Sequence, residues 1–197
     1  MSRPTRHGKG WRGPLRPAVG AALLAVGCSL SGDGPPQEGP PALDRYELGG
    51  DFELVDQRGE GFSLSERRGR PLLLFFGFTR CAASCPTTLS KLGEVMRRLP
   101  APAVEVLFVS VDPAHDTPER LAEYCAGYPY PLTGLTGTPE QVAAVARRYG
   151  AGFSPAADGT VDHSSRTYLI DAEGTVRFLF SEEDGVEEMA ALIRQLL

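Results

Sequence analysis

Two cysteines, Cys81 and Cys85, are separated by three residues in the stretch GFTRCAASCPTTLSKL, where a strongly apolar segment gives way to a helical pattern. Three classes of protein place cysteine at such a strand-to-helix turn: disulfide exchangers, peroxide-reducing enzymes and metal carriers. Both thiols lie at or just before the start of the predicted helix, whose partial positive charge favours thiolate over thiol. The spacing therefore predicts a reactive pair that can close a small disulfide.

The residues around the pair count against the first two classes. Thioredoxin-type exchangers use C-x-x-C, and many carry a proline just before the strand that faces the cysteines. Here the loop is one residue longer, and the corresponding segment VDHSSRTYLID contains no proline. A peroxide-reducing enzyme needs one attacking cysteine, and a second one so close is not its usual requirement. Two ordinary buried cysteines would not explain the pairing at a loop.

A histidine completes a candidate metal site. Of the three histidines, His7 lies in the basic N-terminal segment, His115 in a charged turn expected at the surface, and His163 just before a late predicted strand. In a thioredoxin-like topology that position lies opposite the cysteine loop. Two thiolates and an imidazole suit copper as both Cu(I) and Cu(II), whereas zinc normally requires a fourth ligand. Asp162 either orients His163, contacts a basic partner surface or caps the strand.

The elements that must position these side chains follow from the hydrophobic pattern. A β-hairpin is predicted over 51–66, buried strands over 71–78 and 104–112, and helices over 87–99, 117–128 and 138–150. A second hairpin over 166–180 and an amphipathic helix over 185–197 close the chain. The pattern predicts an α/β, thioredoxin-like fold with an N-terminal β-hairpin. Its parallel strands leave their carboxyl ends open, which is where Cys81 and Cys85 would fall.

Three further residues near these elements have structural interpretations. Asp112 and Asp116 flank a turn that follows a buried strand, and Asp116 is expected to serve that turn and the start of the helix at Thr117. Cys125 lies among helical residues with no partner nearby in the sequence. Core packing is its expected role.

The charge distribution argues against one class of partner. The formal net charge is −5, but residues 1–27 contain five basic and no acidic side chains, so the remainder has 15 basic against 25 acidic residues, or −10. A surface this acidic repels phosphate backbones. No nucleic-acid partner is therefore expected, and cations or basic protein surfaces fit better.

The N-terminus has the pattern of an export signal. Five basic residues precede the short apolar run AVGAALLAVG, which ends at Cys28. The small residues before Cys28 resemble a lipoprotein processing site, at which the cysteine becomes the lipid-bearing first residue. An uncleaved signal anchor and an unmodified Cys28 are the alternatives. We expect a signal peptide over 1–27, a flexible Gly/Pro-rich tether over 28–44 and a folded domain over 45–197, anchored to a membrane in the cell envelope and outside the cytoplasm.

Four ordered blocks carry a resemblance to a known family. GFTRCAASCPTTL, FVSVDPAHDTPERL, LTGLTGTPEQV and VDHSSRTYLIDAEG resemble the Sco (SCO/SenC) family of copper proteins, in that order and at those separations. The resemblance covers most of residues 45–197. Ala82 stands where the family often has proline, and Arg80 where a histidine or another polar residue is common. Neither departure removes a ligand, but both concern loop rigidity and partner contacts.

The resemblance implies a membrane-tethered domain that binds one copper ion through Cys81, Cys85 and His163. It also implies a role in assembling the dinuclear copper centre of cytochrome c oxidase. The expected partners are then an upstream copper donor and the copper-receiving subunit of the oxidase. Two functions stay open: a copper metallochaperone, and a thiol-disulfide reductase that keeps the oxidase's copper-site cysteines reduced. Copper retention needs His163, whereas dithiol exchange does not.

Overall fold

The computed structural model describes residues 43–101, 104–155, 161–163 and 166–197, with backbone alone for 153–155 and 161–163. Seven strands form one sheet in the order β2-β1-β5-β4-β3-β8-β9, and β6 and β7 form a separate pair. The elements are β1 (Glu53–Asp56), β2 (Gly61–Ser63), η1 (Leu64–Arg67), β3 (Leu72–Gly77), α1 (Ser84–Met96), β4 (Glu105–Ser110), α2 (Pro118–Ala126), β5 (Leu132–Thr136), α3 (Pro139–Arg148), β6 (Phe153–Pro155), β7 (Val161–His163), β8 (Thr167–Ile170), β9 (Val176–Phe180) and α4 (Val186–Arg194).

The centre of the sheet is parallel and its flanks are antiparallel. β4 runs parallel to both β3 and β5, while β8 pairs antiparallel with β3 and β1 pairs antiparallel with β5. Every residue of β3 and of β4 is buried, as the two continuous apolar runs predict. The segments that leave the carboxyl ends of β3 and β4 therefore emerge side by side at one edge of the sheet.

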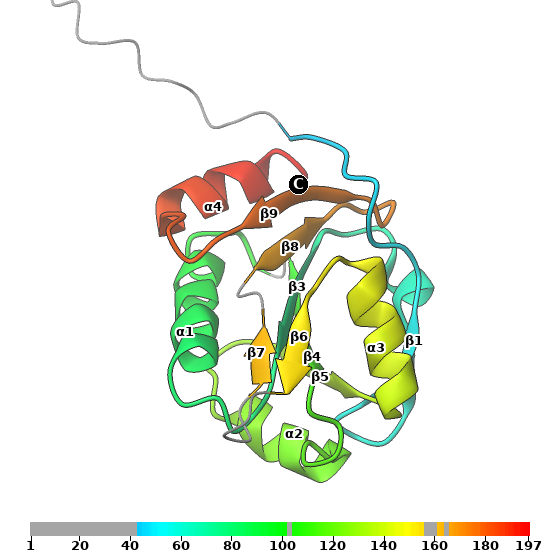
Figure 1. The fold of residues 1–197 in the computed structure, drawn as a ribbon. Helices are drawn as coiled ribbons and strands as arrows, with labels where there is room; N and C mark the ends of the chain where they lie inside the picture. Colours follow the sequence, from blue (N-terminus) through cyan, green and yellow to red (C-terminus); the bar gives the residue numbers. More distant parts are fainter. Residues whose placement is uncertain (1–42, 102–103, 156–160, 164–165) are drawn as a thin grey trace, which may run out of the picture. The chain divides into compact units, whose positions relative to one another are not determined.

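Helices cover both faces of this sheet (Figure 1). Apolar residues of α1, α2 and α4 pack with Phe75 and Phe108 on one face. On the other face, α3 packs with the β1–β2 hairpin, η1 and Phe76, and Tyr149 lies fully buried in this second core. Two apolar layers with the sheet between them make the α/β sandwich that the sequence predicts.

Two helices begin where Thr-Pro pairs predict that they should. The side chain of Thr117 accepts a hydrogen bond from the backbone of Arg120 at the start of α2. Thr138 and Gln141 form a reciprocal capping box at the start of α3. In both helices the proline follows the capping residue, where its missing N–H costs nothing. The predicted hairpins, β1–β2 and β8–β9, are also confirmed.

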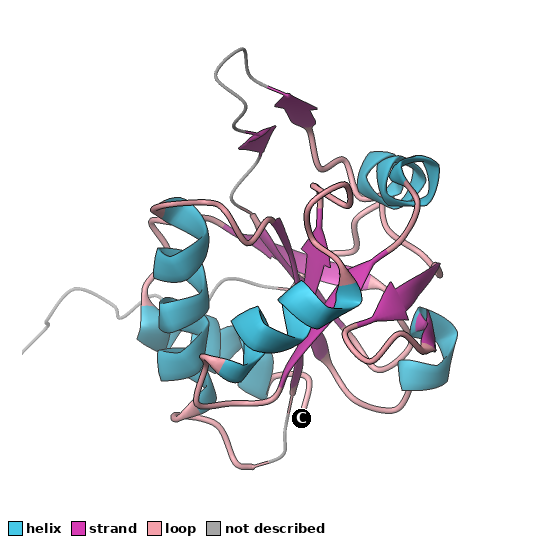
Figure 2. Cartoon of the chain, turned by 90° about the horizontal axis from the view of Figure 1, so that it is seen from below, coloured by secondary structure: helices cyan, strands magenta, loops and turns pink. Residues whose placement is uncertain are grey.

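The structure adds three features that the sequence pattern missed. β5, in which each threonine precedes a glycine, is the third of the parallel strands, next to β4. β6 and β7 form a short antiparallel ladder, visible as the two small arrows set apart from the main sheet at the top of Figure 2. α1 begins at Ser84, three residues before the predicted start at Thr87, so Cys85 lies inside its first turn. Within the described residues, no helix is both long and apolar enough to cross a membrane.

Candidate metal centre

Cys81 and Cys85 lie together at the point where β3 passes into α1. A turn follows the strand, in which the Cys81 N–H donates a hydrogen bond to the carbonyl of Phe78 at 3.2 Å. The backbone N–H of Cys85 then donates to the sulfur of Cys81, with an N···S distance of 3.4 Å. The first turn of α1 therefore directs one of its unpaired N–H groups at the Cys81 sulfur, as expected for a helix N-terminus that binds an anion.

The two thiols differ in their exposure. Cys85 is fully buried, whereas Cys81 is partly exposed and contacts both apolar cores. Gly77 makes room for the buried thiol: a Cβ atom at this position would lie 2.8 Å from the Cys85 sulfur and 2.7 Å from the ring of Phe108. The end of β3 thus lets Cys85 pack directly against the sheet, while Cys81 stays within reach of solvent.

The more exposed cysteine, Cys81, is also the more acidic of the two. Burial acts to raise the pKa of Cys81, but hydrogen bonds from Ser84 and from the Cys85 backbone outweigh it and lower that pKa to about 6. The Ser84 oxygen lies 3.2 Å from the Cys81 sulfur and donates when Cys81 is a thiolate. Burial raises the pKa of Cys85 to about 12, and the neighbouring Cys81 sulfur acts in the same direction. Near neutral pH the pair therefore consists of one thiolate and one thiol. The expectation that the helix start favours thiolate at both cysteines is wrong for Cys85, because burial raises its pKa.

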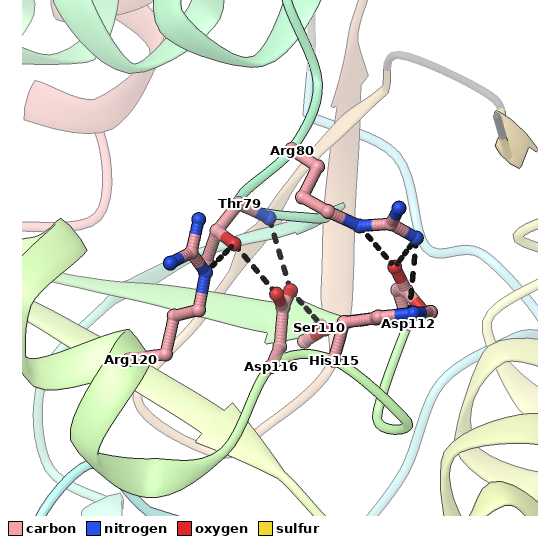
Figure 3. A network of polar contacts seen from close by, with 7 residues as sticks. All are labelled: Thr79, Arg80, Ser110, Asp112, His115, Asp116 and Arg120. Carbon is pink, nitrogen blue, oxygen red and sulfur yellow. Dashed lines mark hydrogen bonds and ion pairs between the residues drawn. The ribbon is translucent and has the colours of Figure 1, made fainter.

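A buried carboxylate holds the residue two places before Cys81. Asp116 accepts hydrogen bonds from the backbone N–H of Thr79 at 2.9 Å, from the Thr79 hydroxyl at 2.6 Å and from the Ser110 hydroxyl at 2.6 Å (Figure 3). Thr117, not Asp116, caps α2. Asp116 does serve the turn, as expected, because its N–H donates to the Asp112 carbonyl at 3.0 Å and its carboxylate accepts from Ser110 on the other side of the turn. The sequence did not predict that the same carboxylate also holds the cysteine loop through Thr79.

Arg80 is held by a second carboxylate from the same segment. Its guanidinium lies 2.6 Å from Asp112, and the Nδ1 atom of His115 lies 2.8 Å from the other oxygen of Asp112 (Figure 3). Asp112 is almost fully buried, and the pKa of its carboxyl is lowered because its hydrogen bonds with His115 and Arg80 outweigh the effect of burial. His115 itself is exposed, as predicted.

Sequence reasoning identified the two cysteines but missed Thr79 and Ser110. A usable signal was present, because Ser110 ends one buried strand, Thr79 lies two residues beyond the end of another, and the two strands pair in parallel. Their carboxyl ends must meet at one edge of the sheet. Cys125 is buried in the core near Gly134, as predicted. Burial raises its pKa to about 12.

His163 is the last residue of β7, and its backbone pairs with Phe153 of β6. Asp162 precedes it in the same strand, opposite Ser154. The side chains of both residues lie outside the described part of the structure, and so does Cys28. Among the described residues, no three His, Cys, Asp or Glu side chains gather into a metal-binding group. The two described ligand candidates nevertheless have the soft thiolate chemistry that suits copper.

Comparisons with known proteins show which family this chain matches. The family model described as SCO1/SenC matches residues 40–197. An SCO2-like protein of Rickettsia conorii is 38% identical over 161 residues, which cover 77% of this chain and 78% of that protein. Solved structures of ScoI with copper bound are similar, from Bradyrhizobium japonicum (37% identity, TM-score 0.68, 76% of this chain and 99% of that one) and from Arabidopsis thaliana (32%, 0.71, 75% and 99%).

The range matched by the family model extends over the whole described domain. This range, 40–197, includes the β3–α1 segment with its two cysteines and the segment that contains His163. The thioredoxin-like fold expected from the sequence is confirmed by the similarity to the solved Sco structures. The chain belongs to the SCO1/SenC family.

Proposed function

We propose that this protein is a copper metallochaperone that binds one copper ion through Cys81, Cys85 and His163. The observation that carries the proposal is the contact between the Cys85 N–H and the Cys81 sulfur at 3.4 Å, which brings both thiols to the first turn of α1. Two cysteines presented in this way can ligate one soft cation, and Cu(I) prefers sulfur ligands. Two relatives with the same fold were solved with copper bound.

The acidity of the two thiols supports copper binding. A metal ligand must be deprotonated, and Cys81 already is at neutral pH because its pKa lies at about 6. Cys85 must lose its proton when copper binds, since burial holds its pKa at about 12 in the metal-free protein. Copper binding should therefore release one proton at neutral pH. His163 adds a nitrogen ligand, which lets the same site hold copper as Cu(II).

The proposal includes a location and a recipient. The basic and apolar N-terminal segment followed by Cys28 supports a lipid anchor on the outer side of a membrane, with residues 28–44 as a tether. A tethered domain can reach a membrane-embedded partner. The partners that we propose are an upstream copper donor and the copper-receiving subunit of cytochrome c oxidase, whose dinuclear copper centre this protein helps to assemble.

A second function, thiol-disulfide reduction, is favoured by one observation. Cys81 combines partial exposure with a pKa of about 6, whereas Cys85 is buried with a pKa of about 12. In disulfide exchange the exposed thiolate attacks a partner disulfide and forms a mixed disulfide. The buried cysteine then loses its proton and displaces the partner as a thiolate, which leaves a Cys81–Cys85 disulfide. The substrate would be the disulfide of the oxidase's copper-site cysteines.

The experiment that separates the two functions compares His163→Ala with His115→Ala. Copper stoichiometry is measured on the reduced protein with Cu(I) and Cu(II), and reductase activity is measured on a model disulfide. His163→Ala should lose Cu(II) binding and keep disulfide reduction. His115→Ala removes an exposed imidazole and its hydrogen bond to Asp112 but no proposed ligand, so this variant should keep both activities. Parent-like Cu(II) binding by His163→Ala would refute the ligand set and favour the reductase.

A further inference from the structure

Asp116 is a fully buried carboxylate that the metal-binding chemistry does not use. Burial of a charge is costly unless hydrogen bonds satisfy it. Within the described ranges, no lysine or arginine forms an ion pair with Asp116, and three hydrogen bonds from Thr79 and Ser110 take that role. Two of these bonds end on the residue that lies two places before Cys81. The Asp116 carboxylate therefore binds the cysteine loop through Thr79.

The direction of each bond follows from the partners. The Thr79 hydroxyl accepts from the Nε of Arg120 at 3.1 Å, so its proton is directed to Asp116. The Ser110 hydroxyl accepts from the Asp112 N–H at 3.1 Å, so its proton also goes to Asp116. Each of the two hydroxyls therefore donates one hydrogen bond and accepts another. Figure 3 shows Thr79 and Ser110 on either side of the Asp116 carboxylate. A satisfied buried network of this kind is rigid.

This network joins two segments that leave neighbouring parallel strands. Gly77 is in register with Ser110, and the Val111 N–H donates to the Gly77 carbonyl at 2.8 Å. Thr79 lies just beyond that junction, inside the turn closed by the Cys81 N–H and the Phe78 carbonyl. Asp116 thus anchors the turn that places Cys81 over the first turn of α1.

We propose that Asp116 is a positioning residue for the thiol pair. It acts through Thr79, holding the turn so that the Cys81 sulfur stays against the Cys85 N–H. The consequence for copper rests on the proposed function, whereas the consequence for the disulfide depends only on the two cysteines. A looser turn lowers the effective concentration of one thiol at the other, so both copper retention and disulfide closure weaken.

The test uses the full chain in detergent, with Cys28→Ser in every variant so that this thiol does not contribute. Asp116→Asn and Thr79→Val remove parts of the network, and Thr79→Ser restores the hydroxyl. Asp171→Asn is the control, because Asp171 is also buried and accepts from backbone N–H groups, those of Glu173 and Thr175, but lies near the start of β3, at the far end from the cysteines. Asp171 also pairs with Arg177, so its loss should destabilise the fold at least as much. Cu(I) affinity is measured by competition with a chromophoric chelator, the Cys81–Cys85 disulfide by equilibration with glutathione, and stability by thermal unfolding.

We expect Asp116→Asn and Thr79→Val to lower Cu(I) affinity about 10-fold, the lower end of the range for groups that orient metal ligands. The equilibrium constant for disulfide closure should fall by a similar factor. Thr79→Ser should match the parent, and Asp171→Asn should unfold at a lower temperature with both constants unchanged. If Asp116→Asn does not fold, the two constants measured for the milder variant Thr79→Val test the proposal.

Two results would overturn the inference. In the first, Thr79→Val unfolds at a lower temperature but keeps both constants at the parent values, which would make the network a purely structural support. In the second, Asp171→Asn changes the constants as strongly as Asp116→Asn, which would trace the effect to general destabilisation. If the parent itself binds no Cu(I), the proposed function fails. The equilibrium constant for disulfide closure then still tests the positioning role of Asp116.

Discussion

The backbone N–H of Cys85 points at the sulfur of Cys81, 3.4 Å away, at the first turn of α1. Together with the Ser84 hydroxyl, this donor stabilises a thiolate on one cysteine while the other stays buried and protonated. The asymmetry comes from the surroundings of each thiol, because both residues are of the same chemical type but Cys81 precedes α1 and Cys85 lies inside its first turn.

The first prediction concerns the pH profile of alkylation. Thiolate is the reactive form, and its fraction rises as the pH rises through the pKa, so Cys81 should reach half of its maximal rate with iodoacetamide at about pH 6. Cys85 and Cys125 should stay unreactive in the folded protein below about pH 9, because burial raises the pKa of each. Mass spectrometry of the three peptides gives the profile, and Ser84→Ala should move the Cys81 midpoint upward.

The same shift links pH to stability. The pKa of Cys81 is lower in the folded protein than the ordinary thiol value of 9.0, so the stabilisation is fully present above pH 9 and is lost as the pH falls through about 6. Cys81→Ser should remove this dependence between pH 9 and 6 in urea unfolding of the reduced protein. A profile that is identical in the parent and in Cys81→Ser would contradict the assigned thiolate.

The second prediction concerns redox gating. Cys81 and Cys85 should form a disulfide on oxidation, and the oxidised protein should take up no Cu(I) until it is reduced. Cys125 should take no part, because its sulfur packs near Gly134 in the core, where a Cβ on that glycine would lie 2.9 Å away. Peptide mapping of the oxidised protein checks the pairing. A disulfide from Cys125 to either loop cysteine would be evidence against it.

The third prediction concerns the role of His163. His163→Ala should keep both cysteine ligands and hence weakened Cu(I) binding, because Cu(I) tolerates coordination by two sulfurs. Cu(II) affinity should fall by at least about 100-fold, since loss of a group that merely orients a ligand already costs about 10–100-fold. The sulfur-to-Cu(II) charge-transfer absorption should disappear. Cys81→Ser and Cys85→Ser should each abolish copper binding and disulfide reduction together.

Support of oxidase assembly in a deletion strain provides the cellular readout for the same variants. His163→Ala should fail to restore the dinuclear copper centre even though its dithiol is active. Restoration by this variant, with parent-like Cu(II) binding, would move the reductase function ahead of the chaperone function.

The fourth prediction concerns the space beneath the buried thiol. Gly77→Ala would place a methyl group 2.7 Å from the Phe108 ring and 2.8 Å from the Cys85 sulfur, closer than atoms in a packed core allow. Overpacking of this kind should reduce the free energy of unfolding by about 1–3 kcal/mol. The matched control is Gly61→Ala in β2, where a Cβ meets no atom within 4 Å. Urea unfolding of both variants checks the difference, which equal stabilities would refute.

The fifth prediction concerns the membrane anchor. Mass spectrometry of the membrane fraction should find a mature chain that begins at a diacylglyceryl-modified Cys28. Recovery of an intact and unmodified segment over residues 1–27 would rule out the lipoprotein assignment and favour a signal anchor.

The sequence by itself determined most of the elements and identified the cysteine pair. Continuous apolar runs predict β3 and β4 because a strand buried on both faces needs no alternation. Thr-Pro pairs predict the starts of α2 and α3 because threonine supplies the cap and proline needs no N–H partner. Cys81 and Cys85 were identifiable because their spacing and their place before a helix are local properties.

Only the tertiary structure decided how the two thiols differ and what holds them. The burial of Cys85 depends on Gly77 and Phe108, which belong to neighbouring strands, and the role of Asp116 depends on the parallel pairing of β3 with β4. β5 was missed because its glycine and threonines give no clear alternation, and its pairing with β4 and β1 stabilises it as a strand. The contact between Thr79 and Asp116 joins residues more than 30 positions apart. The local sequence around either residue does not indicate that the two lie close together in the fold.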